Sequence, residues 1–196
     1  MIPNADAIEA LHHRYARNEA VFDLVYTHCG IVTEIALWCA DRIAAPVDRE
    51  LLIAGCMLHD IGTYALFDDS GHIENQHTYR QHAVFGAALV AEEGYDPRIV
   101  AMIRNHVQMG LSKQEIIDNQ LALPHNDFQP QTLEERLVCY ADRFHTKLPV
   151  FSSYETLLAT MRERLSEQAV KFEAASKEFG IPDVPALAKK YGHPIR

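Results

Sequence analysis

An adjacent histidine and aspartate, His59 and Asp60, are the residues best suited to chemistry, and they end an apolar run over residues 51–58. Gly62 follows, at a position where we expect a left-handed backbone to end the helix. Burying an ionisable pair at the end of a hydrophobic segment costs free energy unless something compensates for the lost hydration. A bound metal cation is one such compensation, so the pair predicts a metal site if the chain supplies further ligands.

The elements that must position this pair are predicted to be helices, because apolar residues recur with helical spacing and no segment shows a convincing strand alternation. The expected helices cover about residues 6–17, 20–43, 48–58, 79–93, 96–107, 112–119, 132–142 and 152–179, with a short one after 183. Ser112 with Glu115, and Thr132 with Glu135, have the spacing of capping boxes. Residues 63–78 and 121–131 are expected to be loops, the second a candidate lid. We therefore expect one all-α domain over residues 1–196, with a C-terminal helical extension over about 152–196.

Six polar residues fall on apolar helical faces or at helix ends that point inward. They are His28, His59, Asp60, His82, His106 and Asp142. Imidazole and carboxylate suit Mn, Fe, Co, Ni or Zn, and the lack of thiolates in the set argues against a structural zinc site. Taken singly, a core histidine is more often a hydrogen-bonded structural residue, and Asp142 could be a cap or pair with Arg143 or Arg136. Five helices that each supply an inward ligand favour the metal interpretation.

These residues, in this order, resemble a known family. His28, the His59-Asp60-Ile61-Gly62 tetrapeptide and Asp142 are similar to the H…HD…D signature of HD-domain metal-dependent phosphohydrolases, in its HDIG form. The resemblance covers about residues 20–150. His82 and His106 match two further histidines of the dinuclear branches, which include the symmetrical diadenosine tetraphosphate hydrolases, the HD-GYP phosphodiesterases and the diiron oxygenases similar to inositol oxygenase. The chain lacks the glycine-tyrosine-proline signature, so we do not expect it to cleave cyclic dinucleotides.

The resemblance implies an HD-type helical bundle with a metal-binding core over about residues 20–150 and two divalent transition metals. His28, His59 and Asp142 would hold one metal, His82 and His106 the other, and Asp60 would bridge both. Iron or manganese is the expected metal, with cobalt, nickel or zinc as alternatives. In such a site a metal-bridging hydroxide attacks phosphorus in line, which makes Asp60 the expected catalytic residue.

Many hydrolases of this family have Lys or Arg directly after HDIG, whereas this chain has Thr63. Cations at other positions must therefore supply the contacts to phosphate. The candidate cations are Arg80, Arg104, Arg143 and Lys147. Lys147 is the preferred one, against simple solvent exposure, and Arg80 is the second. His145, one turn past Asp142, is expected to line the pocket or act as an acid. The other histidines are expected on the surface or in loops: His12, His13, His72, His77, His125 and His193.

The main functional prediction is a hydrolase that cleaves a phosphomonoester or phosphoanhydride of a small molecule, a nucleotide. Without a basic residue at position 63, a diiron oxygenase that acts on a polyol or phosphonate is the first alternative. The second alternative is a non-catalytic nucleotide sensor, in which the long helix from Tyr154 to Phe179 presents a partner surface.

Composition and charge limit the classes of partner that this chain is expected to bind. The net charge of −9 argues against binding to nucleic acid or to an anionic membrane. We expect no membrane span, because no run of about 18 apolar residues occurs, and we expect a cytoplasmic protein, because the start lacks signal-peptide features. The four cysteines are spread singly and are predicted to be reduced and buried. A small phosphorylated substrate is the expected partner, and a homodimer is left open.

Overall fold

The computed structural model describes residues 1–70 and 72–196 and confirms the all-α prediction. Position 71, inside the predicted loop 63–78, lies outside the described residues. The α-helices are α1 (Ala5–Tyr15), α2 (Glu19–Ala40), α3 (Arg49–Leu58), α4 (His82–Glu92), α5 (Pro97–Asn105), α6 (Lys113–Asp118), α7 (Leu133–Ala141), α8 (Tyr154–Arg164), α9 (Ser166–Phe179) and α10 (Val184–Tyr191). Short 3₁₀ helices are η1 (Ile61–Ala65), η2 (Tyr79–Gln81) and η3 (Asp142–Phe144), and the strands are β1 (His145–Thr146) and β2 (Val150–Phe151).

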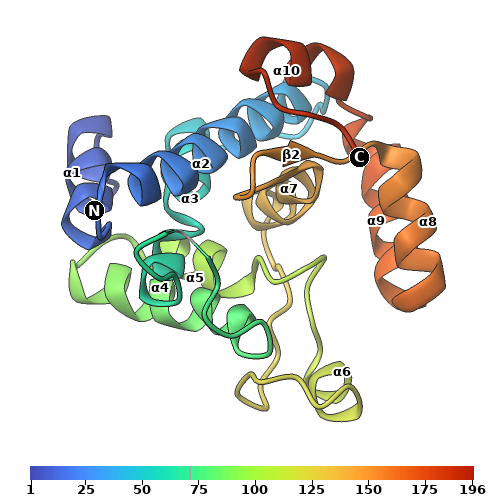
Figure 1. The fold of residues 1–196 in the computed structure, drawn as a ribbon. Helices are drawn as coiled ribbons and strands as arrows, with labels where there is room; N and C mark the ends of the chain where they lie inside the picture. Colours follow the sequence, from blue (N-terminus) through green and yellow to red (C-terminus); the bar gives the residue numbers. More distant parts are fainter. Residues whose placement is uncertain (71) are drawn as a thin grey trace.

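Helix α2 is the centre of the core. It packs against α3 and α7, and α10 lies over its C-terminal half (Figure 1). Val25, Ile31 and Ile35 on its inner face are fully buried. By length and hydropathy α2 would also pass as a membrane span, but half of its apolar window is buried inside the fold, as in a core helix. The expectation of no membrane span therefore stays a prediction.

Most predicted helix starts have the expected caps. The Asp48 side chain accepts from the Leu51 amide, and Ser112 and Glu115 form a complete capping box. The box predicted at Thr132 is only half formed. Thr132 accepts from the Glu135 amide, but the Glu135 carboxylate accepts from the Gln131 amide at 3.2 Å and from Asn105 Nδ2 at 2.8 Å rather than from the Thr132 amide. The buried Glu135 carboxylate thus links α7 to the end of α5 and does not accept the hydrogen bond from the N-cap amide that would complete the capping box.

The single helix predicted over 152–179 is wrong, because the chain breaks at Leu165, whose φ of −148° and ψ of 61° are not helical. A straight helix of that length would extend roughly 40 Å and could pack only part of its apolar face against one small core. The break lets α8 and α9 lie side by side (Figure 1). As a result Leu158 and Met161 of α8 and Phe172 of α9 are all buried.

A small hairpin was not predicted. Strands β1 and β2 pair antiparallel directly after η3, with His145 opposite Phe151. Two residues per strand are too few for an alternation pattern to be visible in the sequence. The segment 194–196 extends this pairing, since the Phe151 amide donates to Pro194 O and the Arg196 amide donates to Phe151 O. In the segment 121–131, Phe128 is buried in a small cluster with Ile116 of α6, and its backbone pairs with that of Leu111. The role of this segment as a lid stays a prediction.

His12 contradicts its predicted surface position. It is fully buried, and its Nε2 donates to Met57 O while its Nδ1 accepts from the Tyr64 hydroxyl. These bonds tie α1 to α3 and η1. The sequence does contain a signal, because Ile8, Leu11 and His12 have the i, i+3, i+4 spacing of one helical face.

Candidate metal centre

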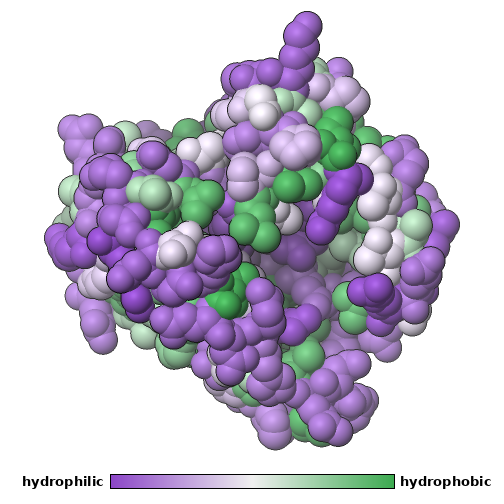
Figure 2. Space-filling view, in the orientation of Figure 1, coloured by the Kyte–Doolittle hydropathy of each residue, from purple (hydrophilic) through white to green (hydrophobic). Residues whose placement is uncertain are grey.

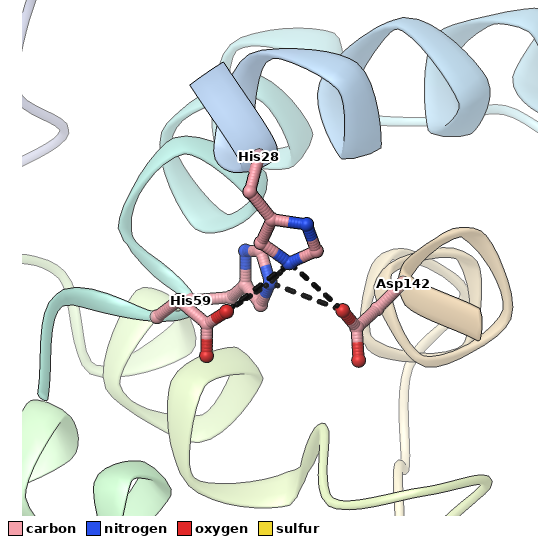
Figure 3. A group of neighbouring side chains, drawn as sticks. His28, His59 and Asp142 are labelled. Atoms are coloured by element: carbon pink, nitrogen blue, oxygen red, sulfur yellow. Dashed lines mark hydrogen bonds and ion pairs between the residues drawn. The ribbon is translucent and has the colours of Figure 1, made fainter. Parts of the chain in front are cut away.

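The first ligand group joins three segments around His28 Nε2. This atom lies 3.1 Å from Asp142 Oδ1, 3.2 Å from His59 Nε2 and 3.1 Å from Asp60 Oδ2. His28 comes from the middle of α2, His59 from the end of α3 and Asp142 from the end of α7 (Figure 3). All of these residues are buried.

The second group uses the other oxygen of Asp60. His82 begins α4, and its Nε2 lies 3.2 Å from Asp60 Oδ1 and 2.9 Å from His106 Nε2. His106, directly after α5, has its Nε2 3.6 Å from Asp60 Oδ1. In each group the candidate ligand atoms lie within 4.8 Å of one another. One carboxylate thus offers an oxygen to each group, which is the arrangement of a bridging ligand.

The hydrogen bonds around the histidines test whether metals fit. His59, His82 and His106 each direct Nδ1 at the backbone carbonyl three residues earlier. The partners are Cys56 at 2.7 Å, Tyr79 at 2.6 Å and Ile103 at 2.6 Å. A carbonyl can only accept, so Nδ1 carries a proton in all three rings, and in the neutral rings of His82 and His106 Nε2 presents a lone pair. Lone pairs that face one another cannot form hydrogen bonds, but they can share a cation.

Asp60 gives a second sign of fit. Both of its oxygens are buried without a well-aligned hydrogen bond in the described part of the chain, although Oδ2 has the Lys147 ammonium beside it. Buried carboxylates without such bonds are costly unless they are paired or coordinate a metal. The donor set therefore fits two divalent metals, and the role of the six residues as ligands stays a prediction.

Comparisons with known proteins agree with this arrangement. A family model described as the HD domain matches residues 25–147. The chain belongs to the HD-domain family. It is 36% identical over 131 residues to an uncharacterized protein of Methanocaldococcus jannaschii, covering 63% of this chain and 68% of that protein. It is 28% identical over 162 residues to a tRNA (cytidine(56)-2'-O)-methyltransferase of Picrophilus torridus, covering 83% of this chain. It spans 43% of the length of that methyltransferase.

Solved structures show the same fold. The HD domain of the phosphodiesterase PgpH from L. monocytogenes superposes with a TM-score of 0.57, covering 94% of this chain and 98% of that one. Its complex with cyclic-di-AMP gives a TM-score of 0.58 and covers 96% and 99%. Both are 16% identical to this chain, so the likeness concerns the fold. The expectation that this HD domain does not cleave cyclic dinucleotides stays a prediction.

The buried surroundings shift the pKa values of several candidate ligands toward the protonation states that can bind a metal. Burial lowers the pKa of His82 to about 3, more than Asp60 raises it, and burial also lowers the pKa of His106. Both rings are therefore neutral near pH 7. Burial acts in the same sense on His59, but the neighbouring groups, Asp60 and Asp142 among them, together raise its pKa above the usual value. Burial alone would raise the pKa of Asp60, whereas Lys147 and the histidines hold it well below its usual range.

Gly62 has a different role from the one predicted. It lies inside η1 and is not in the left-handed region, so it does not end α3 as a left-handed cap. A Cβ at this position would overlap the carbonyl oxygen of His82 and the amide nitrogen of Gly86. The close approach of η1 to α4 thus requires glycine, and this approach brings His82 to Asp60. Thr63 is buried, and its hydroxyl donates to the Asp60 carbonyl at 2.7 Å.

Two of the predicted cations lie beside the ligand groups. Lys147 Nζ is 2.5 Å from Asp60 Oδ2, and the side chain is 14% exposed. Burial lowers the pKa of Lys147, but Asp60, Tyr79 and Asp142 together raise it more, so the net direction is upward. Arg143 pairs with the outer oxygen of Asp142, so the predicted alternative of an ion pair at Asp142 is also present. Arg136, the other predicted partner, pairs with Glu178 instead.

The remaining predicted contacts differ in position. Arg80 lines a cavity beside the site, as expected. Arg104 is directed away, with its guanidinium donating to Asp127 O and lying over the Phe128 ring. His145 lines the second cavity beside the site, as expected, and its two ring nitrogens face His28 Nδ1 and His193 Nδ1, each at 3.0 Å.

Two cavities open at the ligand groups. The smaller, about 250 Å³, reaches both His82 and His106, and the larger, about 470 Å³, extends toward α8. They share the wall formed by Gln76, Tyr79, Asp142, Arg143 and Lys147. The molecular surface is hollowed beside α7, with hydrophilic residues in the depth of the hollow (Figure 2).

Sequence reasoning missed Gln108, which also lines the smaller cavity. Its φ is +56°, a left-handed conformation that is uncommon outside glycine, and its Oε1 is buried with no hydrogen-bond partner among the described residues. Backbone strain and an unpaired buried oxygen are typical of functional sites. The only available signal was that Gln108 follows His106 by two residues.

Proposed function

We propose that this HD domain is a metal-dependent phosphohydrolase that cleaves a phosphomonoester or phosphoanhydride of a small molecule, a nucleotide. The observation that carries the proposal is the position of Asp60. Each of its oxygens faces a separate ligand group, and a lysine and a cavity lie next to them. The tRNA methylation named for the relatives is not part of the proposal, since the chain spans less than half of the first one.

The chain's own residues divide the work between binding metal and binding phosphate. Two divalent cations, when bound, act as Lewis acids toward phosphorus and lower the pKa of an attacking water. Asp60 holds both ligand groups together. Lys147, Arg143 and Arg80 surround the shared wall of the two cavities and supply charge-assisted hydrogen bonds to phosphate oxygens. Lys147 and Arg143 are held by Asp60 and Asp142 before substrate arrives, so they can stabilise charge that develops on phosphate in the transition state.

The larger cavity suits the leaving group. Phe67, Ile73, Leu148, Leu157 and Met161 give it apolar walls, while Lys147 and Arg143 lie at its inner end. A volume of about 470 Å³ falls within the usual range for small-molecule sites. Tyr79 forms part of the same wall, and aromatic rings of this kind stack on nucleobases. This combination of cations at one end and apolar walls beyond supports a nucleotide.

The structure weakens the reasons for the two alternatives. The oxygenase alternative was favoured by the lack of a basic residue at position 63. Lys147 and Arg80 nevertheless provide cations at the site. The sensor relied on one long partner-binding helix over 154–179, and that segment is two helices packed on the core.

Phosphate release from nucleoside mono-, di- and triphosphates with Mn²⁺ or Fe²⁺ tests the proposal. Wild type should release phosphate or a nucleotide product, and Asp60→Asn should not. Arg104→Ala is the matched control, since this arginine lies away from the site and should leave the rate unchanged. Turnover that consumes oxygen, requires iron and releases no phosphate would establish the oxygenase instead. Tight nucleotide binding without turnover under any metal would establish the sensor.

A further inference from the structure

His28 differs from the other candidate histidine ligands in how its ring is held. His59, His82 and His106 are oriented by carbonyls of their own local backbone. His28 lies in the middle of α2, and its Nδ1 instead faces Nδ1 of His145 at 3.0 Å. The ring of the first predicted ligand is thus oriented by a residue from the distant β1–β2 hairpin.

A third imidazole continues this row. His145 Nε2 lies 3.0 Å from Nδ1 of His193, which follows α10. The three rings are nearly parallel, with interplanar angles of 22° and 20° between neighbours. His145 is 3% exposed, so it has little access to water as a substitute partner. The contacts run in one line from the ligand group to the end of α10.

Only one placement of protons satisfies this row when His28 acts as a ligand. His28 Nε2 faces Asp142, Asp60 and His59, so it must offer its lone pair there and carry its proton on Nδ1. His28 Nδ1 then donates to His145 Nδ1, which leaves the His145 proton on Nε2. That proton is donated to His193 Nδ1. Each nitrogen between His28 and His193 has a matched partner in this arrangement.

His193 is itself held by the segment around it. Its amide donates to Ala188 O at the end of α10, and Pro194 and Arg196 pair with Phe151 of β2. Helix α10 is anchored on α2 by Lys190 and Tyr191, whose side chains bond Glu34 at 2.7 and 2.6 Å. The row of rings therefore connects a predicted metal ligand to a segment that is docked by several independent bonds.

We propose that His145 and His193 are positioning residues for the His28–His59–Asp142 metal group, and that metal binding there is coupled to docking of residues 193–196 on β2. Partners of this kind fix the tautomer and orientation of a ligating imidazole. Coupling is reciprocal, so the docked segment strengthens metal binding and bound metal stabilises the docked segment. The inference rests on the metal centre of the proposed function but not on the reaction, and it gives His145 a positioning role in addition to its place in the wall of the larger cavity.

Metal titration of four variants tests the positioning role. His145→Phe keeps an aromatic ring but removes the acceptor, and His193→Phe removes the outer one. His145→Gln can accept from His28 and donate to His193. Equilibrium dialysis with Mn²⁺, followed by elemental analysis, should show one of two sites weakened about 10- to 100-fold in His145→Phe, less in His193→Phe and near wild type in His145→Gln. His125→Phe, in an exposed loop, is the matched control and should bind both ions normally.

Hydrogen exchange at the Phe151 and Arg196 amides supplies a readout independent of activity. Both amides are bonded between β2 and the C-terminal segment. Exchange should be slow in the metal-loaded protein, faster after chelation, and insensitive to metal in His193→Phe. If His145→Phe does not fold, His193→Phe and this exchange measurement decide. The inference would be overturned if His193→Phe bound metal with normal affinity at both sites and if hydrogen exchange at these amides in wild type did not depend on metal. This holds whatever the hydrolase assay shows.

Discussion

Gly62→Ala is expected to destabilise the protein and weaken one metal site. The added Cβ would overlap the His82 carbonyl and the Gly86 amide, both of which are backbone atoms that no rotamer change can move. Overpacking costs roughly 1–3 kcal/mol, and we expect about 3 kcal/mol here because η1 and α4 must separate. For a chain of this size that corresponds to a melting temperature lower by about 6–12 °C.

Gly30→Ala is the matched control. Gly30 lies inside α2, and a Cβ there would meet nothing within 4 Å. Alanine is favoured over glycine in a helix by roughly 0.8–1 kcal/mol, so this variant should melt about 2–4 °C higher. Calorimetry of the metal-free proteins should thus show the same substitution acting with opposite signs at the two glycines.

The metal dependence of Gly62→Ala adds a second check. Separation of η1 from α4 moves His82 away from Asp60, so the His82–His106 group should lose affinity while the His28–His59–Asp142 group keeps it. If Gly62→Ala is as stable as Gly30→Ala and binds metal like wild type, the close-approach explanation of the glycine is wrong.

Three further predictions concern other parts of the chain. Lys147→Met should lower kcat/KM for phosphate release about 10- to 150-fold, as expected for loss of a charged hydrogen bond of roughly 1.5–3 kcal/mol; an unchanged value would exclude Lys147 as a phosphate contact. Burial lowers the pKa of His12 from 6.5 to about 4, so the unfolded chain binds this proton first and stability falls as pH drops from 6.5 toward 4, by up to about 3 kcal/mol. Urea unfolding with chelator should show a shallower loss in His12→Gln, and an identical loss would refute the assignment. Phe172→Ala, which empties a site between Tyr140, Phe144 and Tyr154, should cost about 3–5 kcal/mol in one cooperative transition, whereas two transitions would separate the C-terminal extension from the core.

The grouping of the six candidate ligands was predictable from sequence, because each of them interrupts an apolar pattern. His28 lies on a face with Ile31 and Ile35, and His59 and Asp60 end an apolar helix. A polar residue at such a position needs a buried partner, and a shared partner is the simplest explanation for several of them. The spacing along helices also placed most helix starts correctly, since caps such as Asp48 and Ser112 are local signals.

What the sequence could not supply depends on contacts between distant segments. The approach of η1 to α4 explains Gly62, but nothing near Gly62 in sequence shows that His82 will lie against it. The break at Leu165 has no proline or glycine to mark it and follows from packing both halves on the core. The partners of His145 lie on α2 and beyond α10, so its positioning role was visible only in the fold.

Metal stoichiometry shows directly whether Asp60 joins two metal groups. Elemental analysis after loading with Mn²⁺ should give two ions per chain for wild type. His82→Ala should retain one ion, Asp142→Ala should retain one, and Asp60→Asn should lose tight binding of both. One ion per wild-type chain, with a content unchanged by His82→Ala, would show that Asp60 does not bridge two metals.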